Sequence, residues 1–254
     1  MILAFDVGNS TISFGGFEGD ELSFVAGMTA DVRSTADEYA VKITNILSLK
    51  GIAADSIGGA IIASVLPPLN CVIKQALKSL YGIDPLTVGP GVKTGIGIRC
   101  DLPSSVGADI ICSCVAANTL YGAPGLIVDL DTATKITATD ATGAFVGTSI
   151  APGIVMGLNA LSEGSVLLPK VELSNPAGAI AKNTADCMRS GVIYGAAAMV
   201  DGMIKRIFSE LGQSLPVVVT GAQAELILPY CSHPMTYDEH LVLKGMNIIY
   251  RKNN

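Results

Sequence analysis

The stretch Met1-Ile-Leu-Ala-Phe-Asp-Val-Gly-Asn-Ser-Thr-Ile-Ser-Phe-Gly15 decides how the rest of this chain is interpreted. Its apolar start, residues 1–5, predicts a buried strand that ends near Asp6. Gly8 to Ser10 favour a tight turn, because Gly and Asn tolerate positive φ and Ser hydrogen-bonds turn backbone. A carboxylate at a strand tip, beside a turn with N–H groups and hydroxyls, suits metal-bound phosphate. Taken alone, an ordinary hairpin with a polar turn is the better interpretation.

A second copy of this pattern lies near the middle of the chain. Residues 126–134, Leu-Ile-Val-Asp-Leu-Asp-Thr-Ala-Thr, again give an apolar strand, an aspartate and a polar turn. The spacing from Asp6 to Asp129 is about the length of one small domain. Strands and helices alternate between the copies, which favours parallel pairing. We therefore predict an α/β protein of two similar lobes, residues 1–122 and 123–254, with mixed sheets flanked by helices and a cleft between the lobes.

Local signals place the main helices. Thr35 and Glu38 form a predicted capping box, and a later helix that runs to Gly122 carries Asp109 in or near its first turn. Asn183 caps a long helix whose apolar stripe, residues 188–207, is either ordinary core or a subunit seam. A closing helix over 241–250 is expected to complete the second lobe. The Gly-rich stretch 89–97 is predicted to be a loop and not a Walker A phosphate loop, because Val and not Gly precedes its lysine.

Composition narrows the class of protein. Half of the 254 residues are apolar and 15% are charged, with a mean hydropathy of +0.52, which predicts a substantial buried core. No apolar run approaches the roughly 18 residues of a membrane span, so no membrane partner is expected. The net charge of −6 without a basic cluster argues against nucleic acid. Met1 leads directly into a strand, so we expect no signal peptide, and the six scattered cysteines suggest reduced thiols in a cytoplasmic protein.

The motifs in their order resemble the actin, sugar-kinase and chaperone ATPase superfamily, whose lobes have the ribonuclease H-like fold, and more closely the type III pantothenate kinases. The resemblance covers nearly the whole chain. It rests on these segments: Asp6 to Ser10, Ser64 to Pro67, Gly89 to Gly95, Val106 to Asp109, Asp129 to Thr134, Ile150 to Gly153, Asn183-Thr184 and Thr220-Gly221.

The resemblance implies transfer of the γ-phosphoryl group of ATP to pantothenate, the first step of coenzyme A synthesis, by a homodimer that uses Mg²⁺ and a monovalent cation, K⁺ or NH₄⁺. It implies that Asp109 is the catalytic base and that Asp129 binds the monovalent cation. The implied ATP-binding residues are Asp6, Val7, Gly8, Asn9, Ser10, Thr11, Ile12, Ser13 and Thr132, with Asp6 also placing Mg²⁺. The implied pantothenate-binding residues are Cys100, Gly107, Ala108, Asp109, Ile110 and Thr184.

Some positions depart from the family pattern. Ile110 stands where Arg is usual, Cys100 where Tyr is usual, and Asp131 where the second phosphate turn has Gly. Ala222 replaces a second Gly, and Lys135 replaces a usual Thr and could offset the charge of Asp131. Two alternatives to a pantothenate kinase therefore stay open from the sequence. One is a kinase of another small hydroxylated acceptor, and the other is a non-catalytic paralogue that binds a ligand or a protein.

Overall fold

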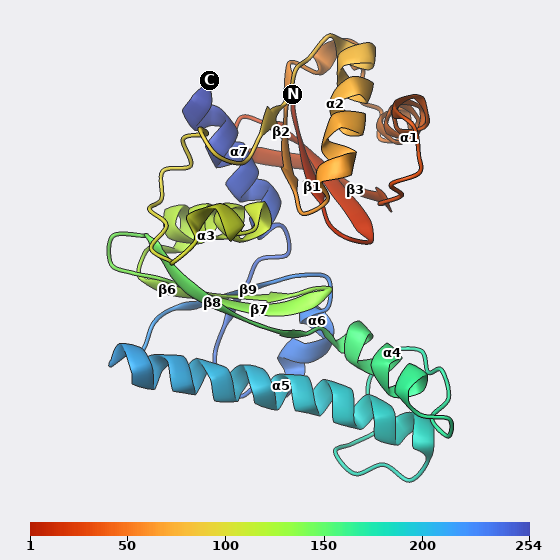
Figure 1. The fold of residues 1–254 in the computed structure, drawn as a ribbon, viewed down its shortest axis with the longest axis vertical. Coiled ribbons are helices and arrows are strands. Elements are labelled where there is room, and N and C mark those ends of the chain that lie inside the picture. The colour runs from red at the N-terminus through yellow and green to blue at the C-terminus, as the bar shows by residue number, and fades with distance from the viewer. The chain divides into compact units, whose positions relative to one another are not determined.

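The computed structural model describes all 254 residues, and the chain forms two compact units (Figure 1). The first unit contains Met1–Leu120 together with Leu241–Asn254, and the second contains Tyr121–His240. The closing helix α7, Leu241–Asn253, thus belongs to the first unit. The prediction that it completes the second lobe is wrong.

The first unit is built on a five-stranded mixed sheet in the order β3-β2-β1-β4-β5. Strands β1 to β3 form an antiparallel meander, while β4 and β5 run parallel to β1. The strands are β1 Ile2–Val7, β2 Thr11–Glu18, β3 Glu21–Thr29, β4 Gly59–Ser64 and β5 Leu86–Thr87.

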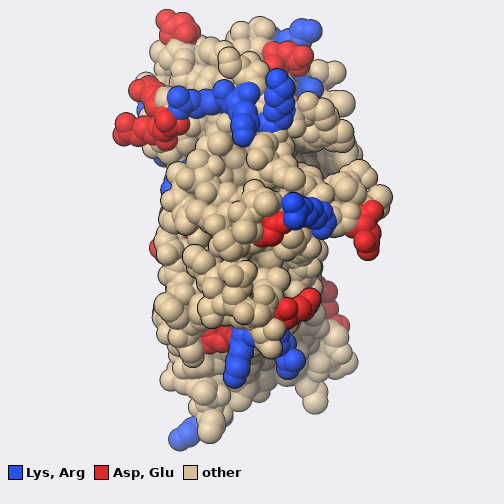
Figure 2. Space-filling view, turned by 90° about the vertical axis from the view of Figure 1, so that its left-hand side faces the viewer, with Lys and Arg blue, Asp and Glu red and all other residues tan.

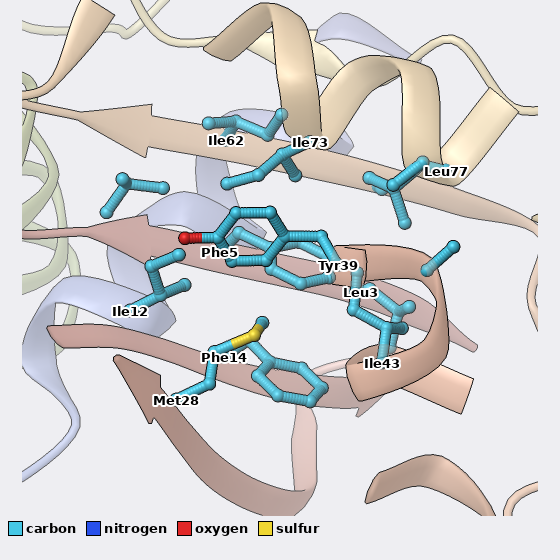
Figure 3. Close-up of a cluster of buried hydrophobic side chains, with 14 of the residues drawn as sticks. Leu3, Phe5, Ile12, Phe14, Met28, Tyr39, Ile43, Ile62, Ile73 and Leu77 are labelled. Atoms are coloured by element: carbon cyan, nitrogen blue, oxygen red, sulfur yellow. The ribbon is translucent and has the colours of Figure 1, made fainter. Parts of the chain in front are cut away.

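Two helices cover one face of this sheet, α1 (Ala36–Leu49) and α2 (Pro67–Tyr81). The predicted capping box of α1 is present. Helix α2 begins with Pro67 and Pro68 in its first turn, where the missing N–H groups cost nothing. Figure 3 shows the core between these helices and the sheet, in which the rings of Phe5 and Phe14 stack with centroids 5.0 Å apart.

Helices α3 (Ala108–Tyr121) and α7 cover the opposite face. Alternation along β1 sends Leu3 and Phe5 to the first face and Ala4 to this one, and Asp6 shares the face of Ala4. Gly245 lets α7 approach α3 closely, since a Cβ there would overlap the backbone of Cys112. The Asn247 side chain also donates a 2.9 Å hydrogen bond to the Gly19 carbonyl. These long-range contacts assign α7 to the first unit.

The second unit repeats the architecture of the first. Its sheet has the order β10-β9-β6-β7-β8, with β6 to β8 an antiparallel meander and β9 and β10 parallel to β6. The strands are β6 Gly125–Leu130, β7 Ala133–Thr139, β8 Phe145–Pro152, β9 Val217–Thr220 and β10 Thr236–Tyr237. The helices are α4 Ile154–Gly164, α5 Thr184–Leu211 and the short α6 Ala224–Ile227. When β6 to β10 are matched in turn to β1 to β5, the two sheets have the same strand order.

The apolar stripe of α5 packs into the core of the second unit. Val200 and Ile204 are at most 1% exposed and contact the buried face of β6 and β9. These residues of the stripe are therefore core of the second unit, whereas Val192, Ala196 and Ile207 are only partly buried.

The surface shows no single-sign patch on the face of Figure 2, where basic side chains lie among acidic ones and most atoms are neither. No helix of the protein has both the length and the apolar character of a bilayer-spanning segment.

Candidate functional site

Asp6 lies near the end of β1, between two strands. Ser13 of β2 and Ala63 of β4 are its direct cross-strand partners. The Asp6 side chain is half-buried, and the residues on either side of it, Phe5 and Val7, are fully buried in the core. The strand thus holds this carboxylate in a fixed position at its tip.

The turn after Asp6 differs in one respect from the prediction. No non-Gly residue in the protein has positive φ, and Gly8 does not have it either. The reason for glycine is proximity, because a Cβ at Gly8 would lie 3.1 Å from the Thr11 carbonyl oxygen, which accepts a 3.0 Å hydrogen bond from the Gly8 N–H. Asn9 and Ser10 are exposed at the tip of the turn.

The predicted ATP-binding residues differ in burial, and therefore in whether their side chains can contact a nucleotide. Val7 and Ile12 are fully buried in the core, so only their backbone can face a nucleotide. Ser10 and Thr11 are exposed and Ser13 is half-buried. Mg²⁺ in nucleotide sites takes one or two protein carboxylates and completes its shell with water and phosphate oxygens. Asp6 with these hydroxyls is such a donor set, so the residues present fit Mg²⁺ and ATP.

Asp109 lies in the first turn of α3, as predicted. Gly107 makes room for its carboxylate, since a Cβ at Gly107 would overlap Asp109 Oδ1. The main-chain oxygen of Asp109 accepts a 2.9 Å hydrogen bond from Ser113 Oγ, which belongs to the same helix. The carboxylate therefore lies beside Gly107 at the N-terminal end of α3.

Asp6 and Asp109 lie near the same thiol, that of Cys112. Burial raises the pKa of Cys112 well above its usual value, and the negative charges of Asp6 and then Asp109 raise it further. The charges of both carboxylates thus reach Cys112, although Asp6 and Asp109 are 103 positions apart in the sequence. A thiol with a raised pKa stays protonated and is a poor nucleophile. Asp6 and Asp109 therefore belong to the same face of the first sheet, and Cys112 on that face is not a reactive thiol.

The predicted pantothenate-binding residues divide between the two units. In the first unit, Cys100 is half-buried in the loop after β5, and Gly107 and Ala108 are half-buried at the start of α3. Ile110 is 8% exposed, so its apolar side chain is buried in the first turn of α3. Thr184, in the second unit, is exposed as the first residue of α5, and the Asn183 side chain caps that helix by accepting from the Asp186 N–H at 2.9 Å.

The second turn, Asp131 and Thr132, is exposed and is braced by two glycines of the second unit. A Cβ at Gly153 would overlap the carbonyl oxygens of this turn, and the Gly153 N–H donates to the Thr132 oxygen at 3.2 Å. Gly221 has a φ of +103°, and a Cβ there would lie 2.5 Å from Leu130 backbone atoms. Gly221 thus lets the segment after β9 lie directly against the last residue of β6.

Asp129 is 8% exposed and forms an ion pair with Lys135. Lys135 lies directly across from it on β7, and its Nζ is 2.8 Å from Asp129 Oδ2. Asp129 was predicted to bind a monovalent cation, but the ammonium group is already at its carboxylate. The residues present do not fit a second cation there.

Lys135 and Gly153 make contacts that the sequence did not predict. The sequence assigned Lys135 only a compensating role beside Asp131, whereas its ion pair is with Asp129. The signal was available, because two strands joined by a short turn place residues that are equally far from the turn opposite each other. Gly153 gave no local signal of its contact with the turn.

Three comparisons with known proteins bear on this arrangement. The family model described as "Type III pantothenate kinase" matches residues 2–206. A protein named type III pantothenate kinase from Moorella thermoacetica is 41% identical over 253 residues, covering 100% of both chains. One of the same name from Brevibacillus brevis is 38% identical, covering 100% of this chain and 99% of its own.

Among solved structures, component A of the (R)-2-hydroxyglutaryl-CoA dehydratase of Acidaminococcus fermentans is similar, with a TM-score of 0.57 and 12% identity. The match covers 99% of this chain and 98% of that one. At that identity the likeness shows the fold alone. It agrees with the two repeated sheets, and the expected α/β fold of the actin-like ATPase type is confirmed.

Proposed function

Because this chain belongs to the type III pantothenate kinase family, we propose that it transfers the γ-phosphoryl group of ATP to the primary hydroxyl of pantothenate. The product is 4′-phosphopantothenate, and the reaction is the first step of coenzyme A synthesis. The observation that carries the proposal is that Asp6, on the Ala4 face of β1, and Asp109, in the first turn of α3, belong to the same face of the first sheet, where one carboxylate would serve Mg²⁺–ATP and the other the acceptor.

Asp6 and the following turn would hold the nucleotide. The carboxylate of Asp6 would place Mg²⁺, which supplies charge neutralisation to the phosphates when bound. Backbone groups of residues 7–12 and the hydroxyls of Ser10, Thr11 and Ser13 would contact phosphate oxygens. Thr132 in the second turn would do the same. Phosphoryl transfer needs positioning and electrostatic stabilisation more than covalent chemistry, so these groups suffice.

Asp109 would be the general base. As the oxygen of the acceptor hydroxyl forms its bond to the γ-phosphorus, the bond from that phosphorus to the β,γ-bridging oxygen breaks, and ADP leaves. The hydroxyl proton passes to an Asp109 carboxylate oxygen. A base in hydrogen-bond reach contributes about 10²–10⁴ in rate.

The acceptor would contact the start of α3 and the loop before it. Gly107 and Ala108 lie at this helix N-terminus, Cys100 lies on the preceding loop, and Thr184 would contribute from α5. Ile110 offers no cationic group to the pantothenate carboxylate. We therefore propose that the acceptor is recognised mainly through its hydroxyl and amide groups.

We further propose a homodimer. Large apolar side chains are exposed on and after α4, among them Val155, Met156, Val166 and Leu167, which are between 43% and 103% exposed. Exposed apolar groups at this density favour an interface with another chain. Light scattering coupled to size exclusion should give twice the mass of one chain, and a monomer mass would contradict the proposal.

The decisive experiment is direct detection of product. The purified protein is incubated with ATP, Mg²⁺ and pantothenate, and 4′-phosphopantothenate is measured by mass spectrometry. Pantothenol, which has a hydroxymethyl group in place of the carboxylate, is tested in parallel. We expect phosphorylation of pantothenate. ATP binding without any phosphorylated product would overturn the proposal.

A further inference from the structure

The Asp129–Lys135 pair is the most completely enclosed ion pair for which the structure gives a distance. The side chains of Lys135 and Asp129 are 15% and 12% exposed, and their charged atoms are 2.8 Å apart. Both residues lie on the hairpin of β6 and β7, where they are direct cross-strand partners. The pair is thus set by the register of two regular strands and does not depend on a mobile loop.

A carboxylate that is largely removed from water needs a cation beside it. The lysine ammonium is a compact point charge with three donors, which makes it chemically similar to a bound NH₄⁺ ion. Two unit charges 4 Å apart repel by about 4 kcal/mol at an effective dielectric constant near 20. A free monovalent cation would therefore have to displace the ammonium group or overcome this repulsion.

The internal repeat shows how the surroundings of Asp6 and Asp129 differ. Asp6 and Asp129 are each the fifth residue of the first strand in their units. The residue across from Asp6 is Ser13, and the residue across from Asp129 is Lys135. The same framework thus places a neutral hydroxyl beside one aspartate and a positive charge beside the other.

We propose that Lys135 is a built-in monovalent cation, which occupies the place beside Asp129 and frees the protein from any requirement for K⁺ or NH₄⁺. The activity part of this inference rests on the proposed kinase function, whereas its ion-binding part does not. The role of Lys135 is electrostatic and positional, because it acts through Asp129 and takes no part in bond making.

The test compares salts at constant ionic strength. Activity and thermal midpoint of the wild-type protein are measured in KCl, NH₄Cl and choline chloride, since choline is too large for the site. We expect activities within a factor of two of one another and equal midpoints. A tenfold or greater activation by K⁺, or a midpoint that rises with K⁺ concentration, would overturn the proposal.

The variant Lys135→Thr opens the place beside Asp129. We expect its activity in choline chloride to fall at least tenfold and to be restored by KCl, with a midpoint that rises as KCl is added. Lys170→Thr removes an exposed lysine of the same unit and should behave as wild type in all three salts. If Lys135→Thr keeps full activity in choline chloride, the built-in cation role is wrong.

The test includes a control variant without either charge and a readout that needs no acceptor. If Lys135→Thr does not fold in choline chloride, the double variant Asp129→Asn, Lys135→Thr removes both charges, and its midpoint should be insensitive to K⁺. A K⁺-dependent midpoint in that double variant would contradict the assignment of the ion site to Asp129. The midpoints need no acceptor, so a wild-type protein that phosphorylates nothing in any salt would refute the kinase proposal and leave the ion-site result to stand or fall separately.

Discussion

Gly245 of α7 lies directly against the backbone of Cys112 in α3, with no room for even a methyl group between the two helices. Close backbone approach of this kind is possible only for glycine. The contact fixes α7, whose residues Leu243, Met246 and Ile249 are buried in the first unit, onto the helix that carries Asp109 at its start.

Gly245→Ala should destabilise the protein. Overpacking against a helix backbone costs about 1–3 kcal/mol, which outweighs the gain of up to about 1 kcal/mol in helix propensity. The free energy of unfolding is measured in urea. Gly195→Ala in α5 is the matched control, because a Cβ there meets nothing within 4 Å, and it should be neutral or stabilising. Equal effects of the two variants would refute the contact.

Asp109→Asn should lower kcat by about 10²–10⁴, because an amide cannot take the hydroxyl proton. The 2.9 Å hydrogen bond from Ser113 is kept in this variant, because it goes to the main-chain oxygen. Asp101→Asn, an exposed aspartate shortly before α3, should keep wild-type kcat. Loss of activity in both variants would show that the effect is not specific to Asp109.

Gly221→Ala should destabilise the second unit more than Gly212→Ala does. Both glycines have positive φ, +103° and +68°, so alanine is strained at either position. Only at Gly221 would the new Cβ also overlap the Leu130 backbone, whereas the Cβ at Gly212 meets nothing within 4 Å. We expect a difference of about 1–3 kcal/mol in the free energy of unfolding. A smaller effect at Gly221 than at Gly212 would contradict the bracing of β6.

The cysteines should differ in reactivity toward a thiol reagent. Cys71 and Cys187 are exposed and should react first in the native protein, while the buried thiols of Cys112 and Cys114 should react only on unfolding. Burial, with a smaller contribution from the Asp109 charge, raises the pKa of Cys114 to about 12. Because this pKa is far above the working range, raising the pH from 7 to 9 should not expose a reactive thiolate there. Rapid native-state modification of Cys114 would contradict the buried position.

The two aspartate turns illustrate what the sequence could predict. Apolar runs ending in Asp6 and Asp129 indicated two strand tips, and the structure confirms both, with the same strand order around each. The capping box at Thr35 and the position of Asp109 in a first helical turn were predictable because their signals lie within four residues.

Three features were not predicted, one because it depends on a contact between distant residues and two because of local backbone geometry. Nothing in residues 241–250 indicates which sheet they cover, and the choice depends on Gly245 meeting Cys112 far away in the chain. Likewise, the buried side chains of Val7 and Ile12 follow strand alternation, although a family motif lists them with their polar neighbours. The positive φ expected in the first turn is absent because Gly8 is needed for closeness to Thr11.

The division of the chain has a consequence for how the protein comes off the ribosome. The second unit is one continuous segment, Tyr121–His240, inserted between the two parts of the first. At roughly 5–20 residues per second, that insertion takes on the order of 6–24 s to synthesise. During this interval the face of the first sheet that α7 will cover stays open, although its strands are already made. The unit that begins first therefore finishes last, and a chain truncated before Leu241 would leave that apolar face exposed to aggregation.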